Sequence, residues 1–206
     1  MGRNIIYVYK GIKLDSKEEL HVARWLEELK KVGLVLDWKR ADSIKVTTGL
    51  KKTWVKETQL KTKLKLEEKN DVLLRPSVYT PDFNVTFTSK GLKLFVGILD
   101  VKEYIPNKLF YKTLNINVLL EIKPIFDKNN MERLFRLNQK FIWETQKTFV
   151  NLVEPISLFK KTFIPLESIP DFKFKRNTKT RNIGDWKLDF KPLTLKDFLH
   201  ESNINR

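Results

Sequence analysis

The stretch NINVLLEIKP, residues 115–124, is an apolar run that ends on a carboxylate and an ammonium group. Its length and its closing proline are typical of a buried β-strand. Side chains alternate along a strand, so Glu121 and Lys123 lie on one face and Leu120 and Ile122 on the other. Burying a charged pair is costly unless something pairs with it. The strand therefore either surfaces here, with both groups solvated, or carries a functional site.

A second carboxylate lies earlier, in YTPDF, residues 79–83. Pro81 fixes φ and marks a strand start, and the apolar alternation of FNVTF, residues 83–87, continues from it. An Asp at a turn is common, so Asp82 has an ordinary structural role available. If its strand lies beside that of Glu121, the two carboxylates supply hard oxygen ligands of the kind that Mg²⁺ prefers.

A third carboxylate stands at the head of the segment LDSKEELHVARWLEELKKVG, residues 14–33. Ser16 with Glu19 fits a capping box, and Gly33 fits a C-terminal stop, so we predict a helix over residues 16–32. Glu19 also lines up with the apolar face of this helix. It can therefore cap the helix and reach a site on the sheet at the same time.

The rest of the chain reads as further strands and helices. We expect a strand at residues 5–9, strands separated by basic loops over 34–75, a β-hairpin over 83–104, a long helix over 127–149, one or two strands over 149–159, and a short helix at 194–201 capped by Thr194. This order predicts an α/β domain in which helices flank a central mixed β-sheet. We place the core at residues 1–165 and a basic C-terminal extension at 166–206.

Two segments carry basic residues that suit a nucleic-acid contact. On the long helix we predict an apolar face of Met131, Leu134, Phe135, Phe141 and Ile142, and a basic face of Arg133, Arg136, Lys140 and Lys147. The basic face either follows phosphates or is simply solvated. In the extension, Lys173, Lys175 and Arg176 alternate with aromatic residues, which suits stacking on exposed bases or a strand that docks on its own domain or on a twin subunit.

Composition narrows the class of protein. The chain has 206 residues and a formal net charge of +15, from 40 basic and 25 acidic residues. This excess indicates a polyanionic partner, most often nucleic acid, or a Lys-, Asn- and Ile-rich genome. The absence of cysteine excludes disulfides and thiolate metal sites and fits a reducing compartment. No apolar run reaches the length of a signal h-region or a membrane span, so we expect a soluble, cytoplasmic protein and no membrane partner.

The ordered set of a Ser-Lys-x-Glu helix, a PDF strand and an apolar strand ending Glu-x-Lys resembles the PD-(D/E)XK nuclease superfamily, over roughly residues 12–155. The nearest likeness is to phage Holliday-junction-resolving endonucleases and transposon-end nucleases. The resemblance implies a restriction-endonuclease-like core. It also implies that Asp82 and Glu121 ligate Mg²⁺ or Mn²⁺, helped by the backbone carbonyl of Ile122, that Lys123 orients the attacking water, and that Glu19 adds a ligand.

One departure from the family leaves a second site open. The separation between Asp82 and Glu121 along the chain is longer than in many members, and Asp100 with Lys102 offers the same Asp-x-Lys spacing between them. We prefer Glu121 and Lys123 because a long amphipathic helix follows them, as the family core requires. After Asp100 there is room only for a short helix.

These observations predict a metal-dependent endonuclease that hydrolyses DNA phosphodiester bonds, with branched or junction DNA as the expected substrate, encoded by a phage and acting in the host cytoplasm. Two cuts at a junction imply a homodimer. One alternative is a non-catalytic nucleic-acid-binding protein in which the carboxylates are structural. Another is the nuclease subunit of a larger transposition or packaging complex.

Overall fold

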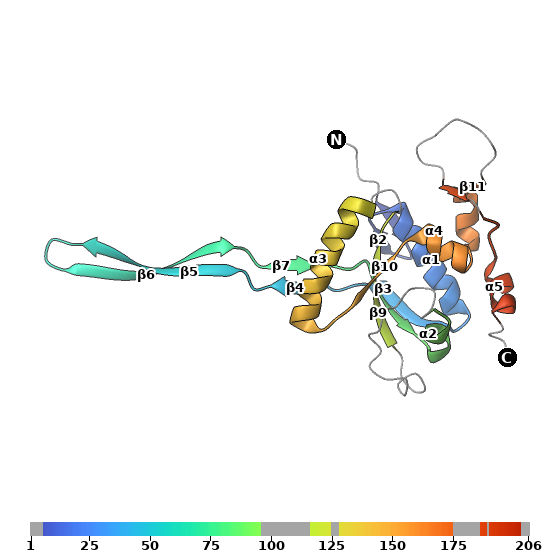
Figure 1. Cartoon of the computed structure of the whole chain (residues 1–206), viewed down its shortest axis with the longest axis horizontal. Helices are drawn as coiled ribbons and strands as arrows, with labels where there is room; N and C mark the ends of the chain where they lie inside the picture. Colours follow the sequence, from blue (N-terminus) through green and yellow to red (C-terminus); the bar gives the residue numbers. More distant parts are fainter. Residues whose placement is uncertain (1–5, 96–115, 125–127, 175–185, 189, 203–206) are drawn as a thin grey trace.

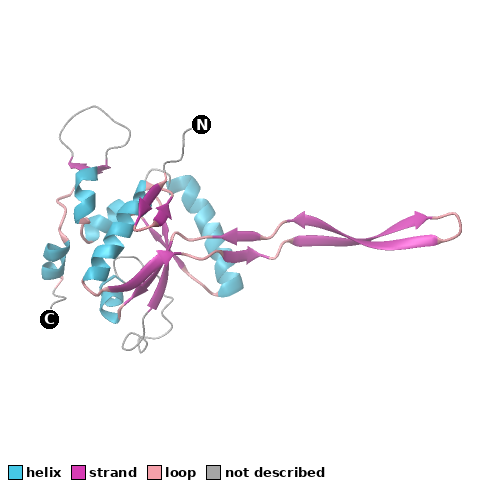
Figure 2. Ribbon diagram, turned by 180° about the vertical axis from the view of Figure 1, so that it is seen from behind, coloured by secondary structure: helices cyan, strands magenta, loops and turns pink. Residues whose placement is uncertain are grey.

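A computed structural model describes residues 6–95, 116–124, 128–174, 186–188 and 190–202. It shows a body of helices around a sheet, from which a long two-stranded arm extends (Figures 1 and 2). In chain order the elements are β1 (Tyr7–Tyr9), β2 (Ile12–Leu14), α1 (Lys17–Lys31), β3 (Val35–Arg40), β4 (Ile44–Thr47), β5 (Leu50–Gln59), β6 (Leu64–Leu74), β7 (Ser77–Tyr79), β8 (Phe83–Phe87), α2 (Ser89–Phe95), β9 (Ile116–Ile122), α3 (Lys128–Gln146), β10 (Val150–Val153), α4 (Pro155–Lys161), the 3₁₀ helix η3 (Leu166–Asp171), β11 (Phe172–Phe174), β12 (Trp186–Leu188) and α5 (Leu195–Glu201).

The central sheet has four strands in the order β10-β9-β8-β3. Strands β3 and β9 both run antiparallel to β8, and β10 runs parallel to β9. Antiparallel neighbours need only short connections, whereas the parallel pair β9–β10 requires a crossover, which α3 supplies. The predicted α/β class with a mixed central sheet and flanking helices is therefore confirmed.

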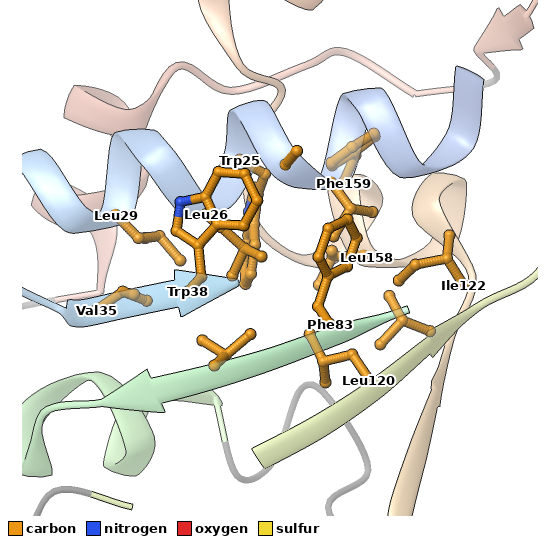
Figure 3. Packing of buried hydrophobic residues seen from close by; sticks show 14 of the residues in the cluster. Trp25, Leu26, Leu29, Val35, Trp38, Phe83, Leu120, Ile122, Leu158 and Phe159 are labelled. Carbon is orange, nitrogen blue, oxygen red and sulfur yellow. The ribbon is translucent and has the colours of Figure 1, made fainter. Parts of the chain in front are cut away.

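The larger hydrophobic core lies between this sheet and helices α1 and α4. Trp25, Leu26 and Leu29 of α1 pack with Phe83 of β8 and Leu120 of β9 (Figure 3). Apolar burial of side chains this large is the main favourable term in folding. The apolar stripe of α1 and the apolar face of the sheet bury each other from water, which explains why the helix packs on the sheet.

A second, smaller core joins α3 to the opposite face of the sheet. It contains Phe135 and Ile142 of α3, Val150 of β10 and, partly buried, Leu119 of β9. Because Leu120 belongs to the first core and Leu119 to the second, the alternation predicted for β9 is confirmed. Glu121 is therefore on the α3 side of the strand.

The long helix is confirmed, but its apolar face is narrower than predicted. Phe135 and Ile142 are buried, whereas Leu134 is 58% exposed and Phe141 42% exposed. On an α-helix these two residues lie about 100° around the axis from the buried pair, and among the described elements α3 packs mainly against strand β4. The Met131 side chain lies outside the described part.

The predicted β-hairpin over residues 83–104 is wrong in its described part. Strand β8 pairs with β3 and β9, and Ser89–Phe95 after it is helix α2. The segment SKG, which resembles a turn, instead opens this helix. Gly91 is required there because a Cβ atom would collide with the carbonyl oxygen of Leu34. Sequence periodicity distinguishes short helices from short strands poorly.

The remaining predictions hold in part. The segment over 149–159 is strand β10 followed by helix α4, which begins at Pro155, a residue favoured at the first helical position. Helix α5 begins where expected, with Thr194 and Asp197 forming a capping box. In the predicted extension, Phe172, Leu188 and Phe198 join the larger core. No helix in the described ranges is long and apolar enough to cross a membrane.

Replacing Ser16 by alanine is expected to lower the free energy of unfolding by about 1 kcal/mol. The Ser16 Oγ accepts a hydrogen bond from the backbone N–H of Glu19 at 3.1 Å, which satisfies one otherwise unpaired donor at the start of α1. Urea denaturation would measure the change. Ser16→Thr, which keeps the acceptor, is the matched control, and equal loss in both variants would contradict a capping role.

Candidate functional site

Asp82 lies where β8 begins, and the backbone on both sides holds it in place. Its N–H donates to the carbonyl of Leu120 at 3.0 Å, and its carbonyl accepts from Ala41 N–H at 3.3 Å. The carboxylate Oδ2 also accepts from the N–H of Ile122 at 2.6 Å. Three contacts to the two neighbouring chain segments therefore fix an acidic side chain at the end of the sheet.

Glu121 brings a second carboxylate to the same place from strand β9. Only 5% of the residue is exposed, and its Oε1 pairs with Lys123 Nζ at 2.5 Å. Its Oε2 and the hydroxyl of Tyr79 are buried, and neither has a hydrogen-bond partner of normal geometry in the described ranges. The Tyr79 hydroxyl nevertheless interacts with the Glu121 carboxylate, which makes it the nearest donor for this oxygen.

Glu19 approaches from the first turn of α1, and Arg40 at the end of β3 connects it to Asp82. Arg40 Nη1 lies 2.5 Å from Glu19 Oε2 and 3.8 Å from Asp82 Oδ1. Its Nη2 contacts Asp15 at 2.8 Å. The guanidinium thus lies among three carboxylates, of which Glu19 is almost fully buried and Asp15 is exposed.

The electrostatics of the site differ from those of a surface cluster. Burial, followed by the negative charges of Glu121 and Glu19, raises the pKa of Asp82 to about 7. Burial and the charge of Glu121 also raise the pKa of the Tyr79 hydroxyl far above its usual range. Close carboxylates that resist joint ionisation are typical of catalytic and metal-binding sites.

The chemical type of these side chains, though not their spacing, suits a hard divalent cation. Carboxylates are the ligands that Mg²⁺ takes from proteins, usually one or two of them together with water. In the ranges that the structure describes, however, no group of three or more His, Cys, Asp or Glu residues is spaced to hold a metal ion. Arg40 and Lys123 hold the carboxylates in ion pairs instead. Metal binding would require Glu19 or Asp82 to exchange its contact with Arg40 for the ion.

The structure brings all four predicted catalytic residues to one end of the sheet: Glu19, Asp82, Glu121 and Lys123. They come from α1, β8, β9 and the residue after β9, which are far apart in the sequence. Ile122 takes part through its N–H to Asp82, while its side chain is in the core. The alternative pair Asp100 and Lys102 lies outside the described residues.

Of the five residues predicted to contact nucleic acid, two have side chains that the structure describes. Arg133 and Lys140 are exposed on α3. Lys173 is in β11, with its side chain outside the described part, and Lys175 and Arg176 also lie outside it.

The side chain of Gln139, also on α3, is used structurally. It accepts from Val150 N–H at 2.7 Å and donates to the carbonyl of Thr148 at 3.2 Å, which ties the helix to the start of β10. A role for Gln139 at the carboxylates would require it to give up both contacts.

Sequence reasoning missed Arg40 and Tyr79. Arg40 follows Trp38 by two residues, so strand alternation places it on the buried face, where a charged residue needs a partner. Tyr79 lies three residues before Asp82, and strand β7, which it ends, could not be placed without its partner β4. Only the first of these two signals was readable in the sequence.

Comparison with protein-family models, curated proteins and solved structures found no match to this chain.

Proposed function

We propose that the chain is a metal-dependent endonuclease with a restriction-endonuclease-like core that hydrolyses DNA phosphodiester bonds. The observation that carries this proposal is the burial of Asp82 against Glu121 and Glu19, which raises the pKa of Asp82 to about 7. Gathering three acidic groups in a poorly solvated place lowers stability unless cations offset their charge. A bound metal ion would supply positive charge beyond that of Arg40 and Lys123.

Asp82 and Glu121 would hold Mg²⁺ or Mn²⁺, and Glu19 would add a ligand after the three carboxylates move closer than they stand in the structure. The bound ion would supply a water of lowered pKa and neutralise charge on the phosphate. Lys123 would orient the attacking water and offset the charge that develops on the phosphate oxygens. Arg40, once released by Glu19 or Asp82, retains Asp15 as a partner and stays beside the substrate.

Charge supports DNA as the substrate. The chain carries a net charge of +15, and the exposed Arg133, Arg136 and Lys140 lie on one face of α3. Cationic side chains facing the phosphates supply most of the sequence-independent affinity for duplex DNA. The resemblance to junction-resolving nucleases favours branched DNA, and two cuts per junction favour a pair of chains acting together.

The test is a cleavage assay on matched linear, three-way and four-way DNA substrates. We expect cuts with Mg²⁺ or Mn²⁺, no cuts with EDTA, and faster cutting of the branched substrates. Resistance of every substrate over a range of Mg²⁺ and Mn²⁺ concentrations would contradict the proposal. Activity only after addition of a partner protein would instead support a subunit of a larger DNA-processing complex.

One observation favours a second function, that of a non-catalytic nucleic-acid-binding protein. Arg40 and Lys123 already pair with Glu19 and Glu121, as they would in a purely structural cluster. Thermal melts distinguish the two readings without an activity measurement. A metal site predicts a melting temperature that rises with Mn²⁺ concentration by mass action, whereas a structural cluster predicts no change.

A further inference from the structure

The arm formed by β5 and β6 is the largest feature that the site does not explain. Its strands pair in antiparallel register from Leu50 opposite Leu74 to Gln59 opposite Leu64. At about 3.3 Å per residue the ten residues of β5 span about 33 Å, close to the 34 Å of one turn of duplex DNA. Figures 1 and 2 show it extending far from the body.

The arm has two chemically different faces, because residues opposite each other in a β-ladder lie on the same side of the ribbon. One face, named here the basic face, carries Lys52, Trp54, Lys56, Thr58, Lys65, Glu67, Lys69 and Asp71. The other carries Lys51, Thr53, Val55, Glu57, Gln59, Leu64, Leu66, Glu68, Asn70 and Val72. Four of the five lysines on the two strands are therefore on one side.

Both acidic residues of the basic face are already engaged. Glu67 pairs with Lys65, and Asp71 accepts a hydrogen bond from Trp54 Nε1 at 2.6 Å. Lys52, Lys56 and Lys65 are exposed, Lys65 while paired with Glu67, and Lys69 is half-buried. The basic face thus presents a row of cations beside an aromatic ring that is 38% exposed.

The arm does not serve the fold of the body. No residue from Leu50 to Leu74 belongs to either hydrophobic core in the part of the chain that the structure describes. A lone two-stranded ribbon is only marginally stable in water. A surface of this length with a row of lysines is therefore best explained by a partner, and charge selects a polyanion.

Both strands of the arm lead back to the carboxylate site through β4 and β7. Arg40 ends β3 just before one leg, and Tyr79 ends β7 on the other, three residues before Asp82. Strands β4 and β7 pair with each other between the site and the arm. A polymer whose phosphate lies at the carboxylates is therefore at the base of the arm, and the arm is placed to follow the polymer outward.

We propose that the arm lies in a groove of the DNA duplex that flanks the reacting phosphate, with Lys52, Lys56, Lys65 and Lys69 against the phosphates. A two-stranded β-ribbon fits the major groove in width. This inference rests on the proposed function for the position of the reacting phosphate. Its own content is the surface, the partner and the length of DNA covered.

The test compares two variants that each remove four positive charges. The first replaces Lys52, Lys56, Lys65 and Lys69 by glutamine. The control replaces the exposed Lys13, Lys161, Lys191 and Lys196 of the body in the same way. Affinity for a fluorescent 30-base-pair duplex is measured by anisotropy in EDTA at several salt concentrations.

We expect the arm variant to bind about 10- to 100-fold more weakly than the control. The magnitude of the slope of log K against log salt concentration should fall by about three to four, because four phosphate contacts are removed. The melting temperature should stay unchanged, because these lysines lie outside both cores. On a longer duplex, nuclease protection should shorten by about one helical turn in the arm variant only.

Equal affinity and equal slope in the two variants would overturn the inference, as would failure of the unaltered chain to bind duplex DNA. A third outcome would also overturn it: the arm lysines have no effect on DNA affinity, but the double variant Val55→Thr, Leu66→Thr converts an oligomer into monomers. The arm would then join two copies of the chain. If the arm variant loses affinity but no substrate is ever cut, the arm proposal stands and the hydrolysis proposal fails. If the arm variant cuts DNA normally and binds it with unaltered affinity, the hydrolysis proposal stands and the arm proposal fails.

Discussion

Replacing Glu121 by glutamine is expected to lower Mg²⁺-dependent cleavage of branched DNA by at least about 1,000-fold. Glutamine keeps the volume of the side chain and can still accept a hydrogen bond from Lys123, but it removes the buried negative charge. A hard cation binds an ionised carboxylate far better than a neutral amide. Losses of this size are expected when a group that stabilises the transition state electrostatically is removed.

Two further measurements separate this loss from misfolding. The Glu121→Gln variant should retain its affinity for duplex DNA in EDTA, because Glu121 is 5% exposed and the proposed phosphate contacts lie on other residues. It should also lose the rise in melting temperature that Mn²⁺ gives the unaltered chain. Glu144→Gln, on an exposed carboxylate of α3, is the matched control and should behave like the unaltered chain. If Glu121→Gln cleaves DNA at a rate within about threefold of normal, Glu121 is not a metal ligand of the catalytic site.

The local parts of the fold could be predicted because their signals are local. Ser16 with Glu19 marks the start of α1, and the alternation around Glu121 gives both faces of β9 correctly. The three carboxylates could be identified as candidates because each lies at an element boundary that the sequence marks. Glu19 follows a helix cap, Asp82 follows a proline, and Glu121 lies at a strand end. Their meeting at one end of the sheet depends on strand order, which no single segment encodes.

The arm was the largest miss, and the reason is physical. Residues 50–74 carry lysines and apolar residues on opposite faces, a pattern that alternation describes equally well for several short strands joined by basic loops. Whether such a segment forms one long ribbon depends on which residue opposes which, and register is weakly specified where neither face is buried. The position of Arg40 two residues after Trp38 was readable, but its partners Glu19 and Asp82 were not, because they come from two other elements.

Replacing Asp82 by asparagine is expected to stabilise the metal-free protein at pH 8.5 by roughly 1–3 kcal/mol. In the folded chain the pKa of Asp82 is raised from 3.8 to about 7, because the carboxylate is buried and faces Glu121 and Glu19, while the hydrogen bond from Ile122 N–H and the charge of Lys123 offset only part of this effect. A raised pKa means that folding favours the protonated acid. Stability from this group is complete below pH 4, falls as pH rises to about 7, and stays low above it.

Asparagine carries no such penalty, so the difference in the free energy of unfolding between the variant and the unaltered chain should vanish near pH 4 and reach its full size above pH 7. Urea denaturation in EDTA at five pH values would trace this curve. The control Asp42→Asn, on a side chain 85% exposed, should leave the free energy of unfolding within about 0.5 kcal/mol of that of the unaltered chain at every pH.

If Asp82→Asn is less stable than the unaltered chain at pH 8.5, Arg40 and Lys123 already neutralise the three carboxylates. The site would then have no excess charge for a metal to neutralise, and a structural cluster would be the better description. A stabilised variant that no longer cuts DNA would show the opposite, a site whose charge is kept for function against the interest of stability.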